Sequence, residues 1–256
     1  EEYDSDEYDE VEDDYDNVQD VLARKLEDGD DWQDLTNLEF WYYLGCDEIF
    51  EQPLPIHNQS TWMLLRGVYH GIVGNENSSI SPLSHEFGIR VPFEARRVTG
   101  KGRGVFATES VKKGDLVWNS RQTAVFTKAE DYREFLISIS PGLACDVTQW
   151  AYIKDRNVGY DGILLDELLD EDNGKEDYVI SVDLDEGILM NDGYYYNTTD
   201  HESEVQNVGC VPDAAEETPG GCIKNVFALR DISAGEELLL SYSDFSFSEA
   251  WKEFGL

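Results

Sequence analysis

Basic residues are scarce in this chain. Its 256 residues include 19 Lys and Arg against 55 Asp and Glu, which gives a formal net charge of -36 at pH 7. A negative field of this size repels nucleic acid and anionic membrane surfaces, and it attracts basic proteins. We therefore expect a basic, lysine-containing protein as the partner and no direct binding to nucleic acid or to membranes.

Patterns that hold a metal ion are missing as well. The cysteines form no CxxC pair, and the histidines form no cluster with ligand spacing, so we expect no metal site. The number of cysteines is even, which leaves disulfides open. The cysteines are Cys46, Cys145, Cys210 and Cys222.

Long apolar runs are also absent. No stretch approaches the roughly 20 apolar residues of a membrane-spanning helix, and no signal-peptide core is present. Three glycosylation acceptor patterns nevertheless keep a secretory or organellar location open. They begin at Asn58, Asn77 and Asn197.

The composition divides the chain into segments. About half of residues 1–31 are Asp or Glu, too many to offset the entropy of ordering the chain, which predicts a disordered acidic tail. A chaperone-like arm for basic proteins is the functional alternative for this tail. Residues 32–88 contain two aromatic-rich stretches, 38–44 and 60–65, that predict short helices packed by large side chains.

The pattern changes at residue 89 to short apolar runs between glycines and charged turns, which is typical of a mostly β domain. Two helices are expected within it, at residues 128–137 and, after the Pro141-Gly142 break, at 146–153. The fold class is therefore mainly β, a β-rich α+β fold at residues 89–245 with a short helical N-terminal appendage. The predicted strands cover residues 89–95, 103–107, 116–118, 123–126, 178–182, 224–229 and 238–241.

Glycine recurs at alternate positions just before an apolar strand, in the tract Gly-Lys-Gly-Arg-Gly-Val-Phe-Ala at residues 100–107. Glycine permits positive φ angles and lets another molecule approach the backbone closely. Alone, this tract indicates no more than a hairpin turn. It is not a dinucleotide fingerprint, because no third glycine at the required offset opens a helix.

A similar phrase closes the domain. GRGVFATESVKKGDLVW at residues 102–118 and FALRDISAGEELLLSYSDF at 227–245 both run from a strand through a glycine turn to a second strand. With these tracts the sequence resembles the SET-domain family of S-adenosylmethionine-dependent methyltransferases. The opening motif of that family is similar to residues 100–107, and its closing motif is similar to residues 227–242. The resemblance covers residues 91–245.

Between the two tracts the family has an Asn-His-Ser-Cys-x-Pro-Asn motif. Residues 190–197, Met-Asn-Asp-Gly-Tyr-Tyr-Tyr-Asn, resemble it, with Asn191 and Asn197 at the family's spacing. Asp192 stands in place of the histidine, and Gly193 stands in place of the serine. A plain turn is the alternative for this tract, because Asn-Gly and Asp-Gly steps favour turns.

The resemblance implies a site for S-adenosylmethionine. By it, Asn191 holds the amino-acid part or the adenine edge of the cofactor, and Asp192 takes the position of a backbone clamp on the adenine. Residues 246–256 would cover the cofactor as a lid, with Trp251 in contact, or dock on the core as a helix. The glycine tract adds residues that line the cofactor chiefly by main-chain groups: Lys101, Gly102 and Arg103.

Tyr242 is the catalytic candidate, because the family places its closing tyrosine at the methyl-transfer channel and beside the cofactor. Trp150 and Tyr152 are candidate channel aromatics, although core packing of a helix explains them better. The resemblance thus implies a protein-lysine N-methyltransferase that acts on a basic protein, with a histone as one candidate, in the nucleus or cytoplasm. It also implies small sheets with a knotted C-terminal part. The alternative is a catalytically weakened SET-like module that holds basic proteins on its acidic surface.

Overall fold

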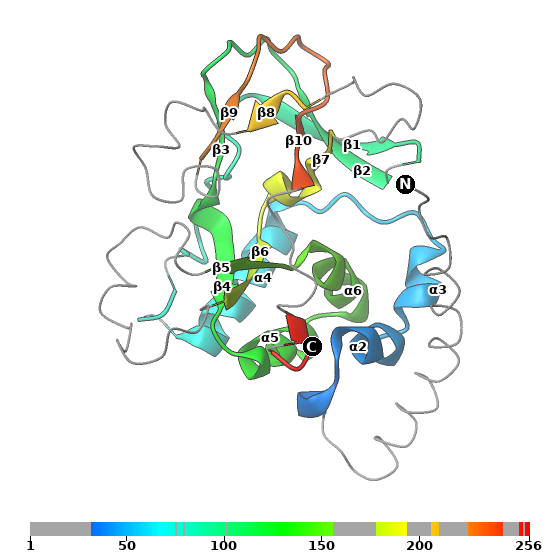
Figure 1. Cartoon of the computed structure of the whole chain (residues 1–256). Coiled ribbons are helices and arrows are strands. Elements are labelled where there is room, and N and C mark those ends of the chain that lie inside the picture. Colours follow the sequence, from blue (N-terminus) through cyan, green and yellow to red (C-terminus); the bar gives the residue numbers. More distant parts are fainter. Residues whose placement is uncertain are drawn as a thin grey trace, which may run out of the picture.

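The fold is that of a computed structural model of the chain (Figure 1). Residues 1–31, where the acidic tail was predicted, lie outside the part of the chain that it describes, and so do Lys101 and Asn197. The described residues are 32–74, 76–78, 80–100, 102–155, 178–193, 206–209, 225–242, 251–252 and 254–256.

Short helices form the N-terminal appendage, as the aromatic stretches predict. They are η1 (Trp32–Asp34), α2 (Asn37–Tyr43), α3 (Cys46–Phe50) and α4 (Gln59–Val73). Helix α2 begins with a capping box, in which the side chains of Thr36 and Glu39 each accept a hydrogen bond from the other's backbone N–H. Helix α4 runs well past the predicted residues 60–65, because Asn58 caps its start and its buried face continues to Tyr69.

Four small sheets, each of two or three strands, lie in the rest of the described chain. Strands β1 (Phe93–Val98) and β2 (Gly102–Ala107) pair antiparallel, whereas β7 (Asn191–Asp192) and β10 (Leu239–Leu240) pair parallel. The other two sheets have the strand orders β3-β9-β8 and β4-β6-β5, with all neighbours antiparallel. Their strands are β3 (Leu116–Asn119), β4 (Thr123–Phe126), β5 (Tyr152–Asp155), β6 (Tyr178–Asp183), β8 (Val208–Gly209) and β9 (Asn225–Ala228).

The strand predicted at residues 89–95 begins later than expected. Strand β1 starts at Phe93, directly after Pro92, which has no backbone N–H to donate to a ladder. Ile89 makes only an isolated bridge with Trp118. The apolar alternation before the proline therefore marks a single contact with β3 and not a strand.

The helix predicted at residues 146–153 was placed too late in the chain. Helix α6 (Pro141–Trp150) begins at the proline, which occupies its first turn, where no intrahelical partner is needed for the missing N–H. The following residues Tyr152 and Ile153 belong to β5 and pair with β6. The Pro-Gly step was thus a helix start, not a break before one.

Helices occupy more of the described chain than strands do, so the expectation of a mainly β fold was too strong. Helix α5 (Ala129–Ile137) follows the prediction closely. Together with α6 and the appendage it makes the fold α+β, with helices α2 to α6 in one half of the molecule and β1, β2, β7 and β10 in the other (Figure 1). None of the helices in the described part combines the length and apolar character that crossing a membrane requires.

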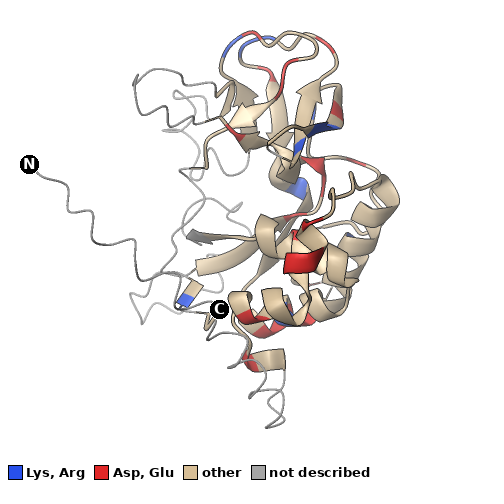
Figure 2. Ribbon diagram, turned by 90° about the vertical axis from the view of Figure 1, so that its right-hand side faces the viewer, with Lys and Arg blue, Asp and Glu red and all other residues tan. Residues whose placement is uncertain are grey.

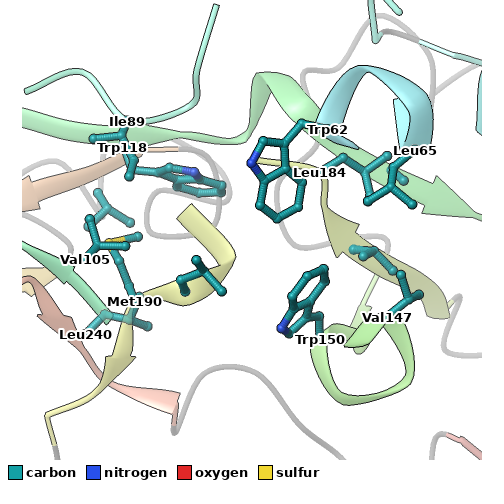
Figure 3. Close-up of a cluster of buried hydrophobic side chains, with 14 of the residues drawn as sticks. Trp62, Leu65, Ile89, Val105, Trp118, Val147, Trp150, Leu184, Met190 and Leu240 are labelled. Carbon is teal, nitrogen blue, oxygen red and sulfur yellow. The ribbon is translucent and has the colours of Figure 1, made fainter. Parts of the chain in front are cut away.

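Tryptophans lie where the appendage meets the domain (Figure 3). Trp62 of α4 and Trp150 of α6 are buried, with ring centroids 5.6 Å apart. A disulfide joins the same two parts of the chain, from Cys46 in α3 to Cys145 in α6. The appendage is therefore packed against the domain as part of one core.

Candidate functional site

The motifs singled out in the sequence meet at one place in the fold. Strand β2 carries the glycine tract, β7 carries Asn191 and Asp192, and β10 is followed by Tyr242 (Figure 1). β7 and β10 are parallel neighbours. An isolated bridge between Phe106 and Glu237 ties β2 to the segment before β10. Three stretches far apart in the sequence thus form one cluster.

The Asn191 side chain links these strands. Its Nδ2 donates to the carbonyl oxygen of Arg103 at 2.8 Å and to Oε1 of Glu237 at 2.7 Å. Both amide hydrogens are therefore used within the chain, which fixes the orientation of the side chain. Among the described residues, Oδ1 of Asn191 has no hydrogen-bond partner, so this oxygen is the atom that a ligand could use.

The close approach of these groups requires glycine at position 104. A Cβ built on Gly104 would lie 2.5 Å from Oε1 of Glu237 and 3.0 Å from Nδ2 of Asn191. Gly100 and Gly102 instead have φ angles of 80°, and a Cβ on either would meet no described residue within 4 Å. Two glycines of the tract thus permit the turn before β2, and the third makes room for the Asn191 amide.

We expect Gly104→Ala to disturb this cluster. The added methyl group must displace the Asn191 amide or the Glu237 carboxylate, and overpacking of this kind costs about 1 to 3 kcal/mol. Urea denaturation measures the loss of unfolding free energy, and the NMR signal of the Asn191 side-chain amide reports the displacement.

Gly67→Ala is the matched control for that substitution. Gly67 is exposed within α4, and a Cβ there would meet nothing within 4 Å. Alanine in a helix interior is about 0.5 to 1 kcal/mol more favourable than glycine, so this variant should gain stability. If Gly104→Ala also gained stability and left the Asn191 signal in place, the tight contact at position 104 would be refuted.

Tyr242 lies beside the same cluster. Its hydroxyl donates to the carbonyl oxygen of Met190 at 2.9 Å, and its backbone N–H donates to Oδ1 of Asp192 at 3.4 Å. Although the residue is 46% exposed, burial of the hydroxyl and the carboxylates of Asp192 and Glu237 raise the pKa of Tyr242 to about 12. The phenol is therefore protonated at neutral pH, where it can donate a hydrogen bond but cannot serve as a base.

The altered centre of the asparagine tract has a local structural reason. The backbone N–H of Gly193 donates to the carbonyl oxygen of Leu240 at 2.7 Å. A Cβ on Gly193 would lie 2.7 Å from the backbone nitrogen of Gln206. The serine of the family motif would clash with the backbone at this position. Glycine therefore allows the chain at Gln206 to pack directly against residue 193.

One residue of this region, Asn207, was missed in the sequence. It is 1% exposed, its Nδ2 donates to the carbonyl oxygen of Glu237 at 2.7 Å, and its Oδ1 accepts from the N–H of Leu239 at 2.9 Å. It therefore holds the closing tract in place beside β7. The signal that could have revealed it is its position directly before the apolar strand Val208–Gly209. Asn197, which was chosen by spacing, lies outside the described residues.

The predicted residues of the glycine tract have different positions. Gly102 opens β2, and the carbonyl oxygen of Arg103 accepts from Asn191, so the main-chain contact of these residues with the cofactor stays a prediction. The Arg103 side chain is 7% exposed and turns to the buried carboxylate of Asp146. Lys101 lies outside the described residues.

The structure does not bring Trp251 to the cluster. Its ring lies 6.2 Å from that of Tyr132 in α5, and Nη2 of Arg133 donates to the carbonyl oxygen of Gly255 at 2.7 Å. The end of the chain accordingly lies beside α5 in Figure 1. Residues 251–252 and 254–256 thus dock on the core, which was the alternative to a lid, and the placement of Trp251 at the cofactor is not supported.

Trp150 and Tyr152 also belong to the interior. Trp150 is 9% exposed and packs on Trp62, so core packing, the preferred explanation, is confirmed for it. Tyr152 is 8% exposed and donates from its hydroxyl to Oδ1 of Asp183 at 3.3 Å. No group of three or more His, Cys, Asp and Glu side chains within the described ranges is arranged to hold a metal ion.

Three comparisons with known proteins were made for this chain. A search of curated proteins finds no significant match. The SET domain protein DIM-5 of Neurospora, a histone lysine methyltransferase, is similar in structure, with 21% identity, a TM-score of 0.33, and 60% of this chain and 53% of that chain covered. CpSET8 from Cryptosporidium is similar with 18% identity, a TM-score of 0.33, and 75% of this chain and 69% of that chain covered.

The family model gives the decisive match. The model of the SET domain matches residues 102–243, which is more than half of the chain. The matched range begins at Gly102 and includes Asn191 and Tyr242, the residues that the fold brings together. The chain belongs to the SET domain family.

Proposed function

We propose that this protein is an S-adenosylmethionine-dependent protein-lysine N-methyltransferase that acts on a basic protein. The observation that carries the proposal is the convergence of the glycine tract, Asn191 and Tyr242 on one cluster in a chain of the SET domain family. The three come from separate stretches of sequence. The family motifs assign each of them to the cofactor or to the methyl-transfer channel, and their convergence supports that assignment.

The chemistry of the cluster fits the cofactor. S-Adenosylmethionine carries a positive sulfonium and a positive ammonium group, and the carboxylates of Asp192 and Glu237 lie close enough to Tyr242 to raise its pKa. The oxygen of Asn191 would accept a hydrogen bond from the cofactor's amino group. The backbone at Gly102 would lie against the ligand, since within the described part of the chain no other group fills the space where its Cβ would be. When bound, the cofactor would supply the methyl group on its sulfonium.

The reaction does not require the protein to act as a general base toward the lysine amine. A lysine amine must be neutral to attack, and from a reference pKa of about 10.4 its deprotonation near pH 7 costs roughly 4 to 5 kcal/mol. An apolar approach and a nearby sulfonium charge disfavour the ammonium form, so that cost is met without a general base. Tyr242, protonated at neutral pH, would line the approach and orient the amine through its hydroxyl.

The charge of the chain suits a basic substrate. The net charge is -36, and Asp and Glu occur on helices and loops of the described part (Figure 2). A field of this sign raises the local concentration of a lysine-rich segment and its rate of association. A histone tail has that character, and so does any other exposed lysine-rich segment.

A catalytically weakened SET-like module is the second candidate. It is favoured by the replacement of the motif's histidine and serine by Asp192 and Gly193. The contacts of Gly193 account for one of these changes by the packing of the chain alone. The knotted C-terminal part that the family implies stays a prediction, because residues 194–205 and 210–224 lie outside the described residues.

The test uses the purified full chain in two assays. Labelled S-adenosylmethionine is offered with histones and, separately, with a whole-cell lysate, and we expect methyl transfer to lysine. Transfer to neither, while a known methyltransferase works in parallel, would overturn the enzyme assignment. Thermal stabilisation by S-adenosylhomocysteine then separates the candidates, since a ligand at 100 times its dissociation constant adds about 2.7 kcal/mol to the unfolding free energy. Stabilisation without transfer points to a weakened module.

A further inference from the structure

A buried ionic cluster connects the N-terminal appendage with the candidate cofactor site. Its centre is Asp146, which is 1% exposed in the middle of α6. Arg103 of β2 and His57 of the appendage are its partners, and they are 7% and 8% exposed. A buried carboxylate is costly unless it is paired and hydrogen-bonded, and both of its side-chain partners among the described residues come from outside α6.

The guanidinium of Arg103 binds this carboxylate in a bidentate manner. Nη1 donates to Oδ2 of Asp146 at 2.9 Å, and Nη2 donates to Oδ1 at 2.8 Å. Nη1 also donates to the carbonyl oxygen of Pro55 in the appendage at 2.9 Å, and the guanidinium carbon lies 5.1 Å from the centroid of the Trp150 ring. Arginine can form such a bidentate ion pair, whereas lysine cannot.

His57 completes the cluster from the appendage side. Its Nε2 lies 2.5 Å from Oδ2 of Asp146, and its ring stands edge-on to Trp62 and Trp150 with centroids 5.4 and 5.5 Å away. Burial raises the pKa of the Asp146 carboxyl, but the hydrogen bonds from His57 and Arg103 more than offset this and lower it overall. The carboxylate form is thus the one that the cluster holds.

The same arginine forms part of the candidate site through its backbone. The carbonyl oxygen of Arg103 accepts from Nδ2 of Asn191, so one residue bonds to Asp146 by its side chain and to Asn191 by its main chain. A guanidinium held at three points restricts the movement of its own peptide group. The orientation of the Asn191 amide, and of the oxygen that would face the cofactor, depends on that peptide group.

We propose that Asp146 is a positioning residue for the cofactor site. Its carboxylate fixes the Arg103 side chain, and the carbonyl oxygen of Arg103 in turn orients Asn191. His57 of the appendage binds the same carboxylate and so helps to hold it in place. The proposal rests on the proposed function, because it assigns Asn191 to S-adenosylmethionine. By it, the N-terminal appendage is a working part of the methyltransferase site and not only a neighbouring piece of structure.

The experiment compares two buried arginines in the full chain. Arg103→Lys keeps the charge but loses the bidentate ion pair, and we expect it to raise the dissociation constant for S-adenosylhomocysteine, measured by calorimetry, about tenfold. Arg66→Lys is the matched control. Arg66 is fully buried in α4 and donates to the carbonyl oxygens of Trp62 and Ser84, so it anchors the appendage without touching Asn191. We expect the dissociation constant of the Arg66→Lys variant for S-adenosylhomocysteine to stay within about twofold of the wild-type value.

A pair of substitutions at His57 separates positioning from packing. His57→Gln keeps an N–H that can reach Asp146, whereas His57→Phe keeps an aromatic ring against Trp62 and Trp150 but has no donor. We expect the glutamine variant to bind S-adenosylhomocysteine within about twofold of the wild type. We expect the phenylalanine variant to bind S-adenosylhomocysteine about tenfold more weakly than the wild type, as Arg103→Lys does.

The NMR signal of the Asn191 side-chain amide in the unliganded chain supplies a readout that needs no cofactor. We expect it to shift in Arg103→Lys and in His57→Phe, and not in Arg66→Lys. If the variants lose thermal stability but keep both the wild-type affinity and the Asn191 signal, the cluster is structural only and the inference is wrong. If the wild type binds no S-adenosylhomocysteine, the proposed function fails, and the Asn191 signal still decides whether Asp146 positions that side chain.

Discussion

Tyr242→Phe should lower the turnover number for methyl transfer by about 10² to 10³-fold, the usual loss when one oriented hydrogen-bond donor is removed from a reacting centre. The hydroxyl donates to the carbonyl oxygen of Met190, and the phenol is protonated at neutral pH. Phenylalanine keeps the ring but leaves nothing to orient the amine. The turnover number and KM for a lysine-rich substrate measure the effect at saturating S-adenosylmethionine.

Binding of the cofactor separates this role from a structural one. Because the lost group acts on the amine and the transferring methyl, the dissociation constant for S-adenosylhomocysteine should change by less than about threefold. The lost hydrogen bond should cost only about 1 kcal/mol of unfolding free energy. Equal losses of turnover and of cofactor affinity would show that Tyr242 supports the structure of the site and not the transfer.

The outer parts of the site were predictable because their chemistry is local. The glycines before β2 and the tract from Glu236 to Tyr242 lie in unbroken stretches, where spacing along the chain fixes their positions in the fold. The structure then brings them together through the bridge from Phe106 to Glu237. Short helices of the appendage were predictable for the same reason, since caps such as Thr36 and Asn58 act within one turn.

The remaining parts depend on contacts that spacing does not reveal. Asn207 lies 16 residues after Asn191, so a motif of fixed length points to Asn197 instead. The side-chain partner of Arg103 is 43 residues away on α6, and no local pattern distinguishes Asp146 from the other acidic residues of the chain. In a chain with 55 acidic residues, only the fold shows which carboxylate is buried and paired.

Removal of the disulfide should give the largest loss of stability. Cys46 of α3 and Cys145 of α6 are 99 residues apart, and both are fully buried. In the chain-entropy account, a bond that closes a loop of about 100 residues stabilises the fold by about 4.7 kcal/mol, and native disulfides typically contribute about 2 to 5 kcal/mol. We therefore expect the double variant Cys46→Ala with Cys145→Ala to lose about 3 to 5 kcal/mol of unfolding free energy in urea.

The same bond bears on where the protein matures. Disulfides form and persist in oxidising compartments and are rare in the cytosol and nucleus, so we propose that this chain folds in an oxidising compartment. Peptide mapping of native protein under non-reducing conditions should recover Cys46 and Cys145 in one linked peptide. Two free thiols, together with equal urea midpoints for the wild type and the double variant, would contradict the bond. The nucleus and cytoplasm would then again be the expected locations.

The disulfide should also affect cofactor binding, since Cys145 directly precedes Asp146 in α6. A chain without the bond should bind S-adenosylhomocysteine less tightly, because the helix that holds Arg103 loses its covalent attachment to the appendage.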